Sequence, residues 1–364
     1  MIKSGLEQGK NGEKDMEEQE KTYKRRKRYK GTHPKKFEEK YKELQPEKYP
    51  DTIEHVMQKG ITPVGMHRSI MVNEILDFLS IQPGQTGFDG TLGYGGHTKE
   101  MLEQLKGEGK IYAFDVDGIE LEKTKKRLED AGYGENILQV NHLNFAEVDQ
   151  IIEESGLFDF ALVDLGVSSM QIDNPKRGFS YKTEGPLDLR LDSERGTSAA
   201  DRLKELTKDE LQGMLWENSD EPYAEEIAEA VTREIKKGNS VDTTQKLRQI
   251  IEDALSFLPE MERKEAVKKS SQRSFQALRI DVNSELEVLY QFLEKLPKVM
   301  NHGGRIAVLT FHSGEDRLVK KSFKRLKRER IYSEISENVI RPSGEECNRN
   351  SRARSTKMRW AIKS

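Results

Sequence analysis

Between about residue 67 and residue 164 the chain alternates short apolar runs with segments whose apolar residues recur at helical spacing. The apolar runs predict strands over Thr86–Asp89, 110–115, 136–140 and Phe158–Asp164. The last run is nearly continuous, as is typical of a strand buried on both faces of a parallel sheet. Helical spacing predicts helices over 69–79, 97–105 and 119–131. Alternation of this kind favours an α/β fold with a doubly wound parallel sheet.

After residue 164 the strand pattern stops, and residues 174–271 show helical periodicity only. Thr207 and Glu210 have capping-box spacing ahead of an apolar stripe, which indicates a helix start. We interpret this segment as an inserted helical domain with its own core. A helix over 285–300, a turn over 301–304, and strands over 305–311 and 357–362 follow. The expected organisation is a Rossmann-like domain of residues 61–173 and 272–364 with a substrate-recognition insertion at 174–271.

Residues 1–60 differ from the rest of the chain. They are rich in Lys, Glu and Gly and almost empty of aliphatic side chains, which predicts a disordered or extended basic N-terminal tail. Within the tail, residues 24–30 read Lys-Arg-Arg-Lys-Arg-Tyr-Lys. This composition suits a phosphate-binding arm, and a solvated charge run is an equal alternative.

Composition and charge restrict the class of protein. Charged residues make up 34% of the 364 positions and the net charge is −3, so nucleic-acid affinity must come from local basic patches. No apolar run approaches the roughly 18 to 20 residues of a membrane span, and residues 1–20 lack the apolar stretch of a secretory signal. Cys347 is the single cysteine, so neither an internal disulfide nor a multi-thiol zinc site is expected. We expect a cytoplasmic protein without membrane or metal.

The first candidate site is a glycine-rich loop between a predicted strand and a predicted helix. Residues 89–97 read Asp-Gly-Thr-Leu-Gly-Tyr-Gly-Gly-His. Glycines allow a ligand close to the backbone, and the helix N-terminus favours a carboxylate or phosphate. Asp115 ends the next strand, where a carboxylate can accept both hydroxyls of an adenosine ribose. Because Thr98 stands where the dinucleotide pattern has its third glycine, a nicotinamide enzyme is disfavoured, and a turn without a ligand is another alternative.

The second candidate site follows the fourth predicted strand. Residues 164–171 read Asp-Leu-Gly-Val-Ser-Ser-Met-Gln, and in a doubly wound sheet they lie opposite the glycine loop. An acidic residue there can orient an exocyclic amine by accepting its hydrogen bonds before the lone pair attacks. Asp164 fits that place, and a simple helix-capping role is the alternative.

Three further segments add polar and basic residues at strand ends and loops: Ser-Phe-Gln-Ala-Leu-Arg-Ile-Asp-Val-Asn-Ser-Glu-Leu at 274–286, Phe-His-Ser-Gly-Glu-Asp-Arg at 311–317, and Ser-Arg-Ala-Arg-Ser at 351–355. Together with the two loops, these segments resemble the RsmH/MraW family from about residue 67 to the end of the chain. The resemblance implies a class I methyltransferase sheet with an inserted all-helical domain. It also implies methyl transfer from S-adenosylmethionine to the N4 amine of a cytosine in the decoding region of 16S rRNA, in the small ribosomal subunit.

The resemblance also implies which residues form the site. The cofactor-binding positions would be Gly95, Gly96 and His97 at the methionine end, Asp115 at the ribose, Phe145 near the adenine, and Asp164 and Gln171 in the rest of the pocket. Asp164 is in addition the expected catalytic residue. No base is identified, although His97 and His312 are candidates by residue type.

The chain departs from the family's usual pattern in four places, of which two are Gly314, where a leucine is common, and the stretch between His312 and Arg352, which is shorter than in many members. The other two are in the insertion and at the N-terminus. Residues 220–223 read Asp-Glu-Pro-Tyr where the family usually has a basic residue, and the basic tail is added. These departures are consistent with a second-copy paralogue. Three alternatives stay open: a cofactor-binding ribosome assembly factor without catalysis, a methyltransferase acting on another RNA, on DNA or on protein, and a homodimeric rather than monomeric state.

Overall fold

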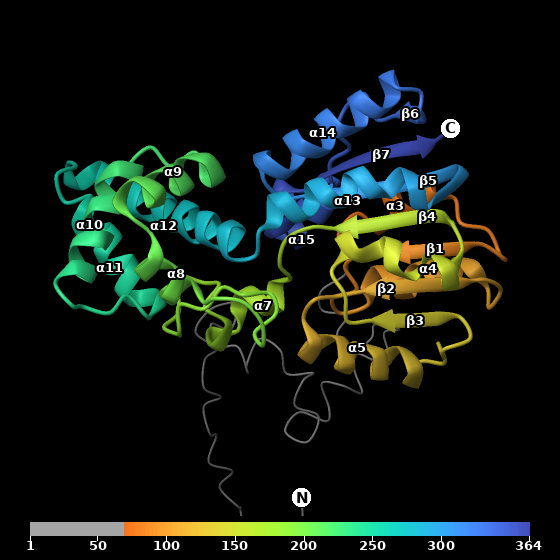
Figure 1. Ribbon diagram of the computed structural model, residues 1–364, viewed down its shortest axis with the longest axis horizontal. Coiled ribbons are helices and arrows are strands. Elements are labelled where there is room, and N and C mark those ends of the chain that lie inside the picture. The colour runs from red at the N-terminus through yellow and green to blue at the C-terminus, as the bar shows by residue number, and fades with distance from the viewer. Residues whose placement is uncertain (1–68) are drawn as a thin grey trace, which may run out of the picture.

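The computed structural model describes residues 69–364, and its frame is one sheet of seven strands ordered β3-β2-β1-β4-β5-β7-β6. The predicted tail, with the basic run at 24–30, lies outside the described residues. The strands are β1 Thr86–Asp89, β2 Lys110–Phe114, β3 Leu138–Asn141, β4 Phe158–Asp164, β5 Met300–Thr310, β6 Tyr332–Ile335 and β7 Lys357–Lys363. Strands β1 to β5 pair in parallel, and β7 runs antiparallel to both of its neighbours. The predicted α/β fold with a doubly wound sheet is confirmed (Figure 1).

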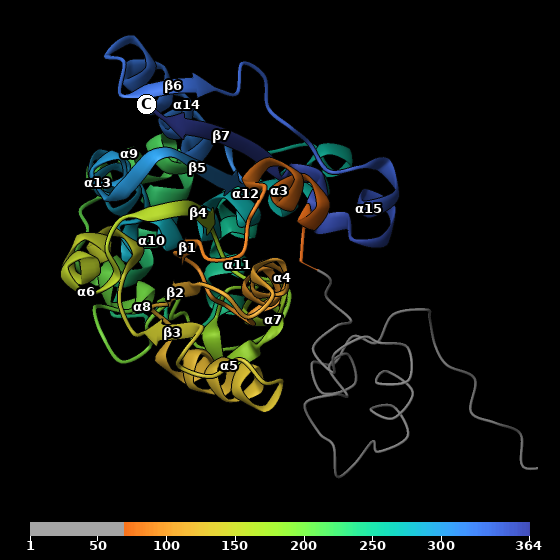
Figure 2. The same ribbon diagram turned by 90° about the vertical axis from the view of Figure 1, so that its right-hand side faces the viewer.

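Helices cover both faces of the sheet (Figure 2). On one face α3 (Val72–Leu79), α4 (Gly96–Leu105) and α5 (Gly118–Asp130) pack on residues such as Phe160 and Leu162. On the other face η2 (Phe145–Ile151), α13 (Glu285–Val299) and α14 (Ser313–Arg328) pack on Ala161 and Val163. Successive residues of β4 point to opposite faces, so an all-apolar strand supplies both cores.

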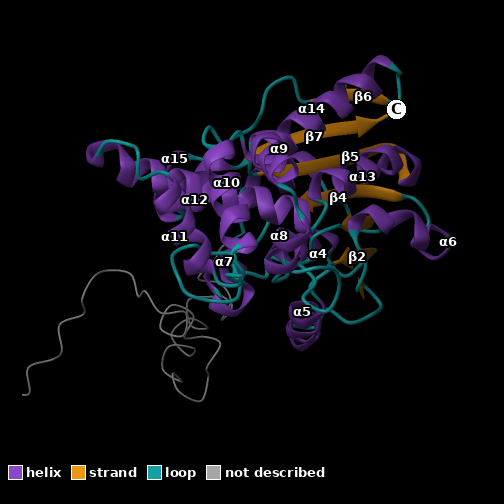
Figure 3. Cartoon of the chain, turned by 60° about the vertical axis from the view of Figure 1, so that its left-hand side comes forward, coloured by secondary structure: helices purple, strands orange, loops and turns teal. Residues whose placement is uncertain are grey.

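The helical insertion has a separate core (Figures 1 and 3). Its helices are α8 Ala199–Glu205, α9 Lys208–Ser219, α10 Ala224–Lys236, α11 Thr244–Ala254 and α12 Glu260–Val282. Thr207 and Glu210 form the predicted capping box at the start of α9. The boundary expected between residues 271 and 272 falls inside α12, which contributes Phe275 and Leu278 to the core of the insertion. We therefore place the end of the insertion at the end of α12.

One local prediction was wrong, and one strand was missed. The turn expected at 301–304 is instead a bulge inside β5: Phe158 pairs with Met300, and Phe160 pairs with Arg305. The glycine-rich residues accommodate the bulge, with Gly303 at a φ of 75°. Strand β6 was not expected, because its four residues include polar side chains and lie at the edge of the sheet. Elsewhere the predicted strands and helices are found with their ends shifted by at most a few residues.

Short helices lie between these elements. α6 (Ile152–Ser155) precedes β4, α7 (Ser169–Asp173) and η3 (Pro175–Arg177) lie between β4 and the helices of the insertion, and α15 (Gly344–Arg349) and η4 (Ser351–Ser355) lie between β6 and β7. Arg352 of η4 is paired with Asp173 of α7, with Nη2 2.8 Å from Oδ1. Within residues 69–364, every helix is too short or too polar to cross a bilayer.

Candidate cofactor and substrate pocket

The glycine loop is hydrogen-bonded to the carboxyl ends of β2 and β4, the two strands that flank β1. Gly90 N–H donates to the Leu162 carbonyl of β4 at 2.9 Å, and Leu92 N–H donates to the Phe114 carbonyl of β2 at 2.8 Å. Asp164 N–H donates to the Thr91 hydroxyl at 2.7 Å. The loop therefore lies where the first and second candidate sites were expected to meet, at the carboxyl ends of β1, β2 and β4.

A buried carboxylate shapes the start of the loop. Asp89 is 1% exposed and accepts hydrogen bonds from Thr91 N–H at 3.0 Å and from the Thr98 hydroxyl at 2.7 Å. Burial raises the pKa of Asp89, and these hydrogen bonds oppose the rise. Because Thr98 lies in α4, Asp89 ties the end of β1 to the helix that follows the loop. Thr98 thus has a structural role at the position where a dinucleotide pattern would have glycine.

The N-terminus of α4 requires glycine at two positions. Gly95 caps the helix with a φ of 76°, and a Cβ there would lie 2.8 Å from Cγ2 of Thr124. A Cβ on Gly96 would lie 2.1 Å from the hydroxyl of Ser69. The first N–H groups of α4 have no partner within the helix and carry the positive end of its dipole. This cradle suits the carboxylate of a methionine moiety.

Asp115 lies directly after β2 and faces the glycine loop. Its Oδ2 accepts a hydrogen bond from Gly93 N–H at 2.7 Å, and its Oδ1 accepts one from Asp117 N–H at 2.8 Å. Burial raises the pKa of Asp115 to about 6, although both hydrogen bonds favour the ionised form. An ionised carboxylate in this place can accept the two hydroxyls of a ribose.

Asp164 ends β4, and one of its carboxylate oxygens accepts no hydrogen bond from the described residues. Its Oδ2 lies 3.5 Å from Nδ1 of His97, while its Oδ1 is buried without a hydrogen-bond partner among the described residues. Burial raises the pKa of Asp164 to about 6, and His97 opposes that rise. The other ring nitrogen of His97, Nε2, lies 2.9 Å from the Ile70 carbonyl. His97 thus positions Asp164 rather than standing free as a base.

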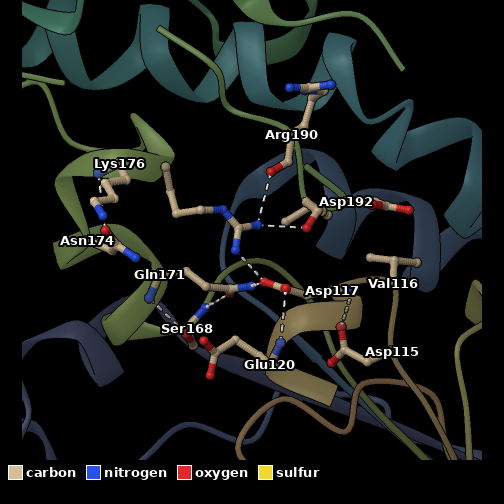
Figure 4. Close-up of polar contacts among 12 residues, drawn as sticks. Asp115, Val116, Asp117, Glu120, Ser168, Gln171, Asn174, Lys176, Arg190 and Asp192 are labelled. Carbon is tan, nitrogen blue, oxygen red and sulfur yellow. Dashed lines mark hydrogen bonds and ion pairs between the residues drawn. The ribbon is translucent and has the colours of Figure 1, made fainter. Parts of the chain in front are cut away.

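The two remaining predicted residues, Phe145 and Gln171, contact different parts of the site. Phe145 begins η2 and packs edge-on against Phe292, with 5.2 Å between the ring centroids. It also lies against Gly90, because a Cβ added to Gly90 would be only 2.9 Å from Cβ of Phe145. Gln171 lies in α7, where Ser168 and Gln171 form a capping box. Its amide nitrogen donates to Oδ2 of Asp117 at 2.9 Å (Figure 4). Phe145 thus borders the pocket from the core, and Gln171 faces the loop that carries Asp115.

Sequence reasoning missed an ion pair between Asp117 and Arg177. Asp117 is 2% exposed, caps α5 through Glu120 N–H and accepts from Gln171 and from Nη1 of Arg177 (Figure 4). Nη2 of Arg177 donates to the carbonyls of Arg190 and Leu191 at 3.1 and 2.7 Å. The Asp-x-Asp spacing at 115–117 offered a weak signal for a second buried carboxylate, but its partner lies sixty residues away.

His312, the other candidate base, is engaged in a structural cluster. Its Nδ1 accepts from Glu315 N–H at 3.4 Å as a cap of α14, and its Nε2 lies 3.1 Å from Oε1 of Glu315. Glu285 lies nearby, within 4.8 Å of both by its ligand atoms, and is held by a bidentate ion pair with Arg279. The cluster already has its cation in Arg279, so it fastens α12, α13 and α14 together.

The residues at 220–223 also have a structural role. Glu221 is fully buried, and its Oε1 accepts from the Ser270 hydroxyl at 2.8 Å and from Tyr223 N–H at 3.1 Å. This run therefore links the α9–α10 corner to α12 inside the insertion.

Comparisons with known proteins show the family of this chain. Residues 65–364 match the model of the MraW methylase family. A ribosomal RNA small subunit methyltransferase H 1 from Lachnoclostridium phytofermentans is 68% identical over 347 residues, covering 95% of each chain. A ribosomal RNA small subunit methyltransferase H 2 from Alkaliphilus metalliredigens is 64% identical over 348 residues, covering 96% of this chain and 100% of the relative. A ribosomal RNA small subunit methyltransferase H from Clostridium botulinum is 36% identical over 310 residues, covering 80% of this chain and 97% of the relative.

The family match spans both parts of the sheet and the whole helical insertion, and it includes every loop described above. The chain belongs to the MraW methylase family.

Proposed function

We propose that this protein transfers a methyl group from S-adenosylmethionine to the N4 amine of a cytosine in 16S rRNA of the small ribosomal subunit, in the cytoplasm. The observation that carries the proposal is Asp164, whose buried Oδ1 has no hydrogen-bond partner among residues 69–364 and lies at the strand end that faces the glycine loop. A buried acceptor without a partner is costly unless a ligand or water satisfies it. The names of the relatives, which are ribosomal RNA small subunit methyltransferases, support the choice of polymer.

The residues around the loop fit S-adenosylmethionine. The N-terminus of α4 at Gly95 and Gly96 suits the carboxylate of the methionine end, and Asp115 suits the ribose hydroxyls. Phe145, which lies against Gly90, offers an aromatic surface for the adenine, and Gln171 is hydrogen-bonded to Asp117, two residues after Asp115. When bound, the cofactor supplies an electrophilic methyl group.

The protein's own contribution is alignment more than acid–base chemistry. Asp164 accepts a hydrogen bond from the cytosine amine and so directs the nitrogen lone pair toward the pocket. His97, held by the Ile70 carbonyl, keeps the Asp164 carboxylate in place. The amine proton is lost after the transfer, and a carboxylate whose pKa is about 6 can accept it.

The chain is more similar to relatives whose names carry a copy number than to the relative whose name carries none. Of the three relatives above, the two with a copy number share 68% and 64% of their residues with this chain, against 36% for the one without. We infer that the chain is one of two copies in its cell, as its departures at 220–223 and in the tail suggested.

Methyl transfer to each class of polymer, together with cofactor binding, distinguishes this function from its alternatives. Labelled S-adenosylmethionine is offered together with small subunits, protein-free 16S rRNA, DNA or total protein, and the labelled polymer is identified. Label in the small subunit or its rRNA supports the proposal, whereas label only in DNA or protein contradicts it. Cofactor binding without transfer to any polymer would instead indicate an assembly factor that retains the fold.

A further inference from the structure

Helix α14 carries a dense group of cationic side chains without partners. Six of them are exposed, namely Arg317, Lys320, Lys321, Lys324, Lys327 and Arg328. No carboxylate of residues 69–364 lies within ion-pairing distance of these six. Arg325, by contrast, is paired with Glu294 of α13 and with Glu329. Each of the helices α4, α5 and α13 carries a lysine that is paired with a carboxylate, namely Lys99, Lys123 and Lys295.

This arrangement is unfavourable for the helix alone. Lys320, Lys324 and Arg328 follow one another at four-residue spacing, so like charges are neighbours on one face. Nothing in the described fold offsets their repulsion. An anionic partner outside the chain would do so.

An open groove of about 1180 Å³ lies beside these cations, between α13, α14 and β6. Its lining includes Tyr290, which is 54% exposed, together with Leu318 and Ile335. Five cations also line it, Lys321, Lys324, Arg325, Lys327 and Arg328, against two carboxylates, Glu337 and Glu294, of which Glu294 is paired with Arg325. An exposed aromatic ring beside an excess of cations is the combination that single-stranded nucleic acid binds, through phosphates and a stacked base.

The groove is connected with the candidate pocket through α14. The helix begins at Ser313, immediately after the carboxyl end of β5, and β5 pairs with β4 up to Asp164. It then runs for about 24 Å along the sheet face away from the pocket (Figure 1). A polymer whose target base lies at Asp164 can thus continue along α14.

We infer that this α14 groove binds ribosomal RNA outside the target nucleotide, with phosphates on the lysines and an unpaired base on Tyr290. The inference rests on the proposed function and adds a second contact surface to it. A protein partner fits less well, because lysine is depleted in protein–protein interfaces whereas phosphate contacts favour it.

The test compares two triple variants of the full chain in binding to small subunits and to protein-free 16S rRNA over a range of salt. One variant removes the groove charges, Lys321→Gln with Lys324→Gln and Lys327→Gln. The matched control removes three exposed lysines of α4 and α5 on the opposite face, Lys106→Gln with Lys123→Gln and Lys126→Gln. Binding of S-adenosylmethionine verifies that each variant is folded.

The groove variant should reduce the slope of log affinity against log salt by about 2 to 3 on both substrates, and the control should leave it near the wild-type value. Tyr290→Ala should weaken binding between about 5-fold and 100-fold without changing the slope, and Tyr290→Phe should retain most of the affinity. Equal slopes for the groove variant and the wild type would overturn the inference.

Two other outcomes also decide the matter. If the groove variant weakens binding to subunits but not to protein-free rRNA, the groove contacts a ribosomal protein and the inference is wrong. If the wild-type chain methylates no RNA, the proposed function fails and this inference fails with it. Methylation by the wild type together with an unchanged slope removes the inference alone.

Discussion

Arg177 donates a hydrogen bond to the buried carboxylate of Asp117 and thereby connects the helical insertion with the loop that carries Asp115. The same guanidinium holds the carbonyls of Arg190 and Leu191. Asp117 in turn accepts from Gln171. The predicted ribose ligand, the predicted Gln171 and the start of the insertion therefore share one hydrogen-bonded group of residues.

Removing Arg177 should be strongly destabilising. In Arg177→Gln, Asp117 stays buried without its cation, and the free energy of unfolding should fall by about 3 kcal/mol. Urea denaturation measures the loss, and adding Asp117→Asn should restore part of it. The control is Arg202→Gln, because the Arg202–Asp281 pair is more exposed and should contribute under about 1 kcal/mol. Equal losses for the two arginine variants would show that the Asp117 pair has no special role.

The Asp164→Asn variant should be more stable than the wild type at pH 8 but less active. The pKa of Asp164 is raised from 3.8 to about 6, so the folded protein is favoured below pH 4 and loses this contribution as pH rises through 6. At pH 8 the ionised, buried carboxylate is therefore unfavourable, and Asn should raise the free energy of unfolding by about 1 to 2 kcal/mol after allowance for a side chain that is 27% exposed. Methyl transfer should fall on the order of 100-fold. Denaturation at pH 8 and pH 4 checks the sign, since the gain should disappear at pH 4.

Cofactor affinity should depend on the ionisation of Asp115. Because the pKa of Asp115 is about 6 and the ionised form accepts the ribose hydroxyls, the Kd for S-adenosylmethionine should rise as pH falls below about 6. Calorimetric titration between pH 5 and pH 8 measures this dependence. Asp115→Asn should bind more weakly at pH 8 and show a shallower pH dependence. A variant with the wild-type pH profile would assign the dependence to another group.

The glycine cradle should not tolerate a side chain. Gly95→Ala places a Cβ 2.8 Å from Thr124 at a φ of 76°, so the free energy of unfolding should fall by about 1 to 3 kcal/mol and cofactor binding should weaken. Gly213→Ala is the matched control. Gly213 lies inside α9 with open space around its Cβ position, so alanine should stabilise the protein by about 0.5 to 1 kcal/mol. Thermal unfolding with and without S-adenosylmethionine separates the two effects.

Strands and loops were predicted best where the local pattern of apolar residues agrees with burial in the fold. Strands β1 and β4 were placed at the correct residues because their apolar runs end at Asp89 and Asp164, and the glycine loop follows the first of them directly. These two strands are neighbours in the sheet, so the two candidate sites meet as a doubly wound topology requires.

The rest depended on contacts between distant residues. The turn chemistry at 301–304 predicted a chain reversal, but pairing with β4 on either side keeps the segment inside β5. The end of the insertion was expected near residue 271, but α12 continues to Val282, and its buried residues as far as Leu278 belong to the core of the insertion. No local pattern could pair Asp117 with Arg177, because the two residues lie sixty positions apart.

The account is tested most directly by methyl transfer to small subunits that lack the modification, with the product nucleoside identified by mass spectrometry. Wild-type protein and Asp164→Asn are compared at equal occupancy by S-adenosylmethionine. The wild type should produce N4-methylcytidine in 16S rRNA, and the variant should bind the cofactor while producing on the order of 100-fold less. Undiminished N4-methylcytidine in the variant, or a methyl group on any other atom, would contradict the role given to Asp164.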